Sequence, residues 1–161
     1  MSRGESPRAA LHAALDRELG TIGTQSVLLS QAVADQLGLS ATDVEVLDLL
    51  GRAGPLAAGQ LAEVTGLTSG AVTRLIDRLE RAGYVQRTPH PQDRRSVLIV
   101  PVAERLAHDV APLYRALEQA LARLYAGYTE DQLALIRDFI GRVNAVAREH
   151  IARLRSAASD G

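Results

Sequence analysis

Paired arginines beside an acid stand at the tip of the proline-containing stretch VQRTPHPQDRRS, residues 85–96. Guanidinium groups bind phosphate through two parallel hydrogen bonds, so Arg94 and Arg95 are predicted to contact a DNA backbone or enter a narrow minor groove. Asp93 would repel phosphate and is expected to orient one of these arginines. From Arg81 to Arg95 there are four arginines and one acid, a local charge of +3 in a chain of net charge −1.

A second set of small, hydroxyl-bearing and basic side chains precedes this tip. The stretch from Thr68 or Ser69 to Gly83 is predicted to be a helix with one apolar face turned to a core. Its opposite face can present N–H groups, hydroxyls and guanidinium groups to phosphates and base edges. The alternative is a solvated face on which Arg78 and Arg81 pair with nearby acids. With Arg94 and Arg95, the predicted DNA-binding residues are Thr68, Ser69, Gly70, Thr73, Arg74, Arg78 and Arg87.

The elements around this helix predict a winged helix-turn-helix domain over residues 40–100. A short helix follows a Ser40 cap, and a second helix over about residues 58–65 ends at a Gly66-Leu67 turn, directly before the helix described above. Short apolar runs on either side of the proline-containing tip predict a β-hairpin. A hairpin directly after a recognition helix is a wing, and prolines restrict its backbone so that it projects at lower entropic cost.

Long amphipathic helices are predicted on both sides of that domain, over residues 7–38 and 102–155. The second segment divides near Gly127 into a helix over 102–126 and another that ends near Leu154. Some of these apolar stripes must pack within the chain, but seams of this length at both ends favour packing on a second copy. Residues 156–161 are expected to be a disordered tail. The predicted dimer contacts are Leu11, Leu15, Ile136, Ile140, Val143, Ile151 and Leu154.

The fold class expected is therefore mainly α, with a small β-hairpin wing. The composition of the chain excludes several classes of function. The chain has no cysteine, which excludes disulfides and thiol chemistry. No apolar run reaches the ~18 residues of a membrane span, and no secretory signal is evident, so a cytoplasmic protein is expected. The four histidines lack metal-ligand spacing. No cofactor, metal or catalytic constellation is predicted, and the chain is not expected to be an enzyme.

The stretch GLTSGAVTRLIDRLERAGYVQRTPHPQDRRS, residues 66–96, resembles the MarR family of bacterial winged helix-turn-helix transcriptional regulators. The likeness extends back through LSATDVEVLDLL and QLAEVTGL, whereas the flanking helices agree in pattern only. The resemblance implies a homodimer with interlocked first and last helices and a pseudo-palindromic double-stranded DNA operator. It also implies a recognition helix in the major groove, with the wing around Arg94 in the adjacent minor groove.

The same resemblance implies a mode of regulation. Many members are repressors that small aromatic or anionic ligands release from DNA, and the ligand lies between the dimerisation helices and the winged domain. The sequence departs from the family at residues 100–104, VPVAE, where members often carry a threonine cap and a glycine before the next helix. A winged-helix module that uses the same surface for a protein partner is the alternative function.

Overall fold

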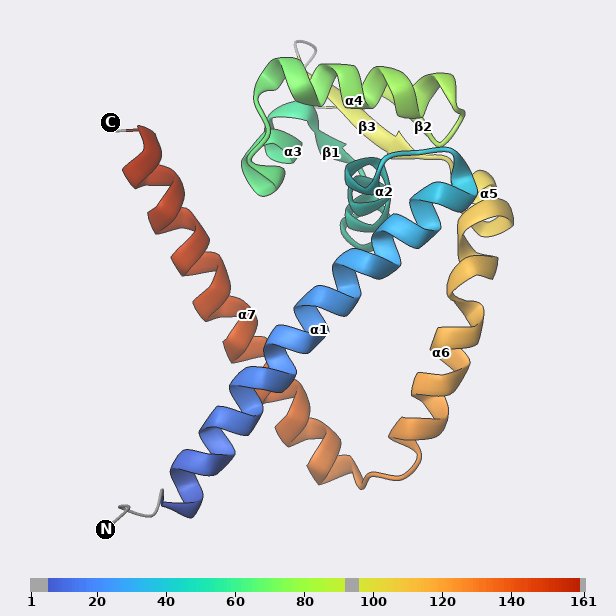
Figure 1. Cartoon of the computed structure of the whole chain (residues 1–161). Helices are drawn as coiled ribbons and strands as arrows, with labels where there is room; N and C mark the ends of the chain where they lie inside the picture. The colour runs from blue at the N-terminus through green and yellow to red at the C-terminus, as the bar shows by residue number, and fades with distance from the viewer. Residues whose placement is uncertain (1–5, 92–95, 160–161) are drawn as a thin grey trace. The chain divides into compact units, whose positions relative to one another are not determined.

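The computed structural model describes residues 6–91 and 96–159, and the chain forms two compact units that divide between Val110 and Ala111 (Figure 1). The mainly helical winged helix-turn-helix fold predicted from the sequence is confirmed. The first unit contains α1 (Pro7–Leu37), α2 (Ala41–Ala53), β1 (Leu56–Ala57), α3 (Ala58–Thr65), α4 (Ser69–Arg81), β2 (Val85–Pro89), β3 (Val97–Pro101), α5 (Ala103–Arg105) and the π-helical turn η1 (Leu106–Val110). The second unit contains α6 (Ala111–Tyr125) and α7 (Glu130–Ser159).

Capping residues set the helix boundaries in the first unit. Ser40 begins α2 with a capping box, in which its hydroxyl accepts from the Asp43 N–H at 3.2 Å and its own N–H donates to Asp43 at 3.1 Å. Gly66 ends α3 with φ of 72°, a left-handed conformation that a residue with a Cβ adopts at a cost. Thr68 then begins α4 two residues later, so the turn between the two helices is short.

The core lies beneath α4. The apolar stripe predicted for this helix is buried, and it packs with α2, α3 and the first residues after α4. Burial of a leucine or isoleucine side chain contributes about 1.5–3 kcal/mol, so this cluster supplies much of the stability of the unit. Its buried members are Val46, Leu47, Leu50, Leu61, Val72, Leu75, Ile76, Leu79, Tyr84, Val85 and Ile99.

The wing belongs to an antiparallel sheet with the strand order β1-β3-β2. The sequence predicted β2 and β3, but the two-residue strand β1, which pairs Leu56 with Ile99, was not predicted. Opposite Ile99 on the other side lies Arg87 of β2. Directly paired residues of an antiparallel sheet project from the same face, so Arg87 shares the face on which Val85 and Ile99 are buried.

The predicted continuous helix over residues 102–126 is wrong in its first part. The chain forms three residues of α-helix, then the π-helical turn η1, and only then α6. Pro112 gives the physical reason: it has no N–H for the carbonyl of His108, four residues earlier, and its ring crowds that oxygen. Leu106 and Val110 pack against the core of the first unit, rather than continuing the seam predicted for the C-terminal helices.

The second unit is a pair of helices whose described residues form no buried core. Thr129 and Gln132 form a capping box at the start of α7. The helix runs to Ser159, five residues beyond the predicted end at Leu154, so residues 156–159 are helical where a disordered tail was expected. Residues 160–161 lie outside the described part of the chain. No residue of α6, and none of the α7 residues whose exposure is described, is buried.

Candidate nucleic-acid interface

The N-terminal half of α4 presents a small, polar and exposed surface. Thr68 accepts a hydrogen bond from the Ala71 N–H at 3.3 Å, and the Thr73 hydroxyl donates to the Ser69 carbonyl at 2.9 Å. These local bonds fix the first turn, while Ser69 and Gly70 add little bulk to it. The helix end can therefore approach another molecule closely, with its free N–H groups and positive dipole end forward. Five of the predicted DNA-binding residues share this surface: Thr68, Ser69, Gly70, Thr73 and Arg74.

Arg74 is the cation of that surface. Its guanidinium group lies over the first turn, where a Cβ added to Gly70 would stand 3.8 Å from Arg74 Nη1. Among residues 6–91 and 96–159, no acid forms an ion pair with Arg74. All five of its N–H donors are thus available to guanine or phosphate acceptors.

Arg78, by contrast, is paired with an acid that the sequence did not suggest. Its Nη2 donates to Asp43 Oδ1 at 2.7 Å and its Nε donates to Asp43 Oδ2 at 3.3 Å. The Asp43 side chain is only 2% exposed. Burial would raise the pKa of Asp43, but the hydrogen bonds from Arg78 and Ser40 outweigh it and hold the pKa below its ordinary value. Arg78 thus compensates a buried charge.

Arg87 is also paired with acids. It donates to Asp77 Oδ1 at 2.5 Å and forms an ion pair with Glu80, both on α4. The hydrogen bond to Asp77, followed by the charge of Glu80, raises the pKa of Arg87. A signal for this pairing was present in the sequence, because Val85 and Arg87 are two apart in a strand and Asp77 and Glu80 are three apart on a helix. Arg81 donates through Nε to the Asp77 carbonyl at 3.0 Å.

Backbone hydrogen bonds hold the two strands of the wing together as far as the base of its tip. Beyond the β2–β3 ladder, the His90 N–H donates to the Ser96 carbonyl at 3.0 Å, which brings the two ends of the tip together. The predicted contacts Arg94 and Arg95, and the orienting residue Asp93, lie in residues 92–95, outside the described part of the chain. Residues 91 and 96 therefore flank the segment that carries the predicted minor-groove contact.

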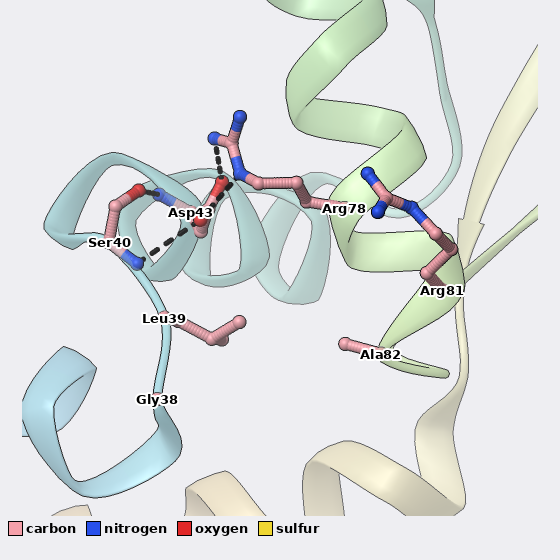
Figure 2. A pocket seen from close by; sticks show the side chains of 7 residues that line it. All are labelled: Gly38, Leu39, Ser40, Asp43, Arg78, Arg81 and Ala82. Carbon is pink, nitrogen blue, oxygen red and sulfur yellow. Dashed lines mark hydrogen bonds and ion pairs between the residues drawn. The ribbon is translucent and has the colours of Figure 1, made fainter.

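A hollow of about 440 Å³ lies between the segment joining α1 to α2 and the C-terminal half of α4 (Figure 2). Leu39 and Ala82 supply apolar surface, and Arg78 and Arg81 project from α4 at its margin. Its other lining residues are Gly38, Ser40 and Asp43. Because Asp43 neutralises Arg78, the hollow keeps one cation, Arg81, that no acidic side chain of the described residues pairs.

Other site types have no support in the described residues. Within them, no three histidine, aspartate or glutamate side chains gather in a way that could hold a metal ion. Every helix in the same part of the chain is too short or too polar to cross a bilayer.

Several known transcriptional regulators are similar to this chain in sequence or in fold. The MarR family profile matches residues 39–97. An uncharacterized HTH-type transcriptional regulator of Bacillus subtilis, YcgE, is 44% identical over 154 residues, covering 96% of each chain. The crystal structure of apo MarR from E. coli aligns with a TM-score of 0.57 and 26% identity, over 80% of this chain and 95% of that one. A mutant of E. coli MarR complexed with operator DNA aligns with a TM-score of 0.53, 26% identity, and coverage of 81% and 93%.

Proposed function

The chain belongs to the MarR family of winged helix-turn-helix transcriptional regulators, and from that premise we propose that it is a homodimeric repressor of a pseudo-palindromic operator, relieved by a small-molecule ligand. Its family and relatives are regulators rather than enzymes, which confirms the prediction of a non-enzymatic protein. The observation that carries the DNA-binding function is the exposed first half of α4. There the N–H groups at the helix start, the hydroxyls and Arg74, which no acid of the described residues pairs, share one face.

Direct contacts divide into two kinds. N–H groups at the start of α4, together with Arg94 and Arg95 on the wing, suit phosphates and the minor groove, which supply affinity without reading sequence. Thr73 and Arg74 lie one turn further along α4 and suit base edges in the major groove. The 26%-identical E. coli MarR mutant was solved in complex with operator DNA, which supports duplex DNA as the partner of this chain.

Dimerisation is supported by the apolar side chains that the isolated chain leaves in water. Leu11, Ile136, Ile140, Ile151 and Leu154 are each more than a third exposed. Apolar exposure on this scale marks a surface that another protein covers. A two-fold axis would place two copies of α4 about 34 Å apart, the spacing of successive major grooves on one DNA face.

A ligand site is supported by the hollow in Figure 2. Its volume of about 440 Å³ suits a small molecule, with Leu39 and Ala82 for an apolar body and Arg81 for an anionic group. The hollow lies between the end of α1 and the C-terminal half of α4, so a ligand there would act on the orientation of the recognition helix. A ligand that prefers one orientation shifts the population toward it.

One experiment tests the core of this proposal. Fluorescence anisotropy would compare duplex DNA from upstream of the gene with a scrambled duplex of equal length, each at two salt concentrations. We expect tight binding to the native duplex that falls steeply with salt, because phosphate contacts release counterions. Equal, weak and salt-insensitive binding to both duplexes would contradict a DNA-binding repressor and favour a protein partner for the winged surface.

A further inference from the structure

Asp43 is a buried carboxylate with all of its hydrogen bonds accounted for. Oδ2 accepts from the Ser40 N–H at 3.1 Å and from Arg78 Nε at 3.3 Å, and Oδ1 accepts from Arg78 Nη2 at 2.7 Å. A buried charge without a counter-charge is strongly unfavourable, so α4 must hold Arg78 over α2. The Nε and Nη2 edge of Arg78, one of the two edges with which a guanidinium group can bind a phosphate, is occupied by this carboxylate.

Arg87 is held in the same way from the other side of α4. Its guanidinium group pairs with Asp77 and Glu80, and its backbone N–H donates to Glu80 Oε1 at 3.1 Å. One arginine between two carboxylates leaves a net charge of −1 on this group. A group with a net negative charge does not attract a phosphate. Its ion pairs do hold β2, the first strand of the wing, against α4.

We propose that Arg78 and Arg87 are positioning residues and do not contact DNA: Arg78 sets α4 against α2 through Asp43, and Arg87 sets the wing against α4 through Asp77 and Glu80. The proposal rests on the proposed DNA-binding function and assigns its direct contacts to the start of α4, Arg74 and the wing tip. A recognition helix tilted by loss of either clamp would present those contacts at the wrong angle.

The salt dependence of binding separates a positioning arginine from one that contacts phosphate. The probe is a 30-base-pair duplex that the wild-type chain selects from a random library, measured from low to high salt. Replacing an arginine that neutralises one phosphate lowers the slope of log affinity against log salt by about 1. We expect Arg78→Ala and Arg87→Ala to weaken binding roughly tenfold without changing this slope. A slope that falls by about 1 in either variant overturns the assignment for that residue.

Asp43→Asn gives a prediction of opposite sign for the two roles. If Arg78 contacted phosphate, removal of the carboxylate that competes for it would strengthen binding and steepen the slope. If Arg78 positions α4, the same change loosens the helix and weakens binding. We expect weaker binding, and we expect the double variant Asp43→Asn/Arg78→Ala to lose no more affinity than the worse single variant, because both changes break one clamp. Stronger binding by Asp43→Asn overturns the proposal.

Folding is controlled with Arg52→Ala, which breaks an exposed ion pair with Asp48 on α2 and should leave both affinity and slope unchanged. All variants are compared below their melting temperatures, with helicity checked by circular dichroism. Arg78→Lys keeps the charge and should restore part of the affinity, since lysine can still reach one oxygen of Asp43. If selection by the wild-type chain enriches no duplex, the proposed function fails with this inference; if it does but Arg78→Ala lowers the slope, this inference fails alone.

Discussion

The phenolic O–H of Tyr84 donates a hydrogen bond to Asp109 Oδ2 at 3.1 Å, which joins the segment between α4 and β2 to the π-helical turn η1. Arg105 pairs with the same carboxylate at 2.7 Å, and its guanidinium carbon lies 5.3 Å from the centre of the Tyr84 ring. Burial and the bond to Asp109 raise the pKa of Tyr84, so the phenol remains a donor at neutral pH. The π-helical turn η1 thus places the Asp109 carboxylate within hydrogen-bond distance of Tyr84, in the segment that follows α4.

Tyr84→Phe should lower the free energy of unfolding by about 1 kcal/mol, because one hydrogen bond is lost while the buried ring keeps its packing. Urea unfolding at neutral pH measures this difference. Tyr128→Phe is the matched control, since Tyr128 is 44% exposed and should leave stability unchanged. Equal stability of Tyr84→Phe and the wild-type chain would show that Arg105 and His108 alone satisfy Asp109.

The Asp43–Arg78 pair predicts a dependence of stability on acid. The folded chain lowers the pKa of Asp43 below its ordinary value of 3.8, so the pair stabilises the fold above that pH. Stability is lost as the pH falls below 3.8 and through the lowered pKa. The difference in unfolding free energy between wild type and Asp43→Asn should therefore be full at pH 6 and shrink in this acid range. A difference that stays constant down to pH 2 would contradict the assignment.

Gly66→Ala should destabilise the helix-turn-helix by about 1–2 kcal/mol, because the left-handed conformation with φ of 72° between α3 and α4 is unfavourable for a residue with a Cβ. Gly59→Ala, in the first turn of α3, is the matched control. A Cβ there meets nothing within 4 Å, and alanine favours a helix over glycine by about 0.5–1 kcal/mol. Thermal unfolding should move the two variants in opposite directions. A stabilised Gly66→Ala would contradict the turn geometry.

Ile140→Asp should convert the proposed dimer to a monomer, because it places a charge in the apolar seam of α7. Leu135→Asp is the matched control: Leu135 is 70% exposed and lies on a different side of the helix from the predicted seam. Sedimentation equilibrium at micromolar concentration would measure the mass of each variant. An unchanged mass for Ile140→Asp, or dissociation by Leu135→Asp alone, would place the interface elsewhere.

Arg74→Ala should relax discrimination at one operator position by about 1–3 kcal/mol, because a bidentate contact with guanine is lost. Arg94→Ala should weaken binding to all duplexes to a similar extent, because a groove or phosphate contact reads little sequence. Competition with single-base operator variants distinguishes the two losses. Equal losses on specific and random duplexes for both variants would contradict the division of roles.

Local signals in the sequence were sufficient for the elements of the fold. The Ser40 cap, the helix start at Thr68 or Ser69, the helix end at Gly66 and the apolar stripe of α4 each depend on a few residues, and each was predicted correctly. The stretch from Thr68 to Arg74 is also local, since it covers only the cap and the first two turns of α4. Its exposure follows from the opposite apolar face, so the polar surface at the start of α4 could be predicted before any packing was known.

Tertiary packing decided which acids Arg78 and Arg87 pair with. Arg78 and Asp43 are 35 residues apart, and only the packing of α4 on α2 makes them partners. Arg87, Asp77 and Glu80 meet because β2 lies beneath α4, although their spacings hinted at a shared face. The π-turn follows from Pro112, but its register follows from Leu106 and Val110 packing into the core. Caps and stripes act within one element, whereas a charge pairs with whichever acid the fold brings within reach.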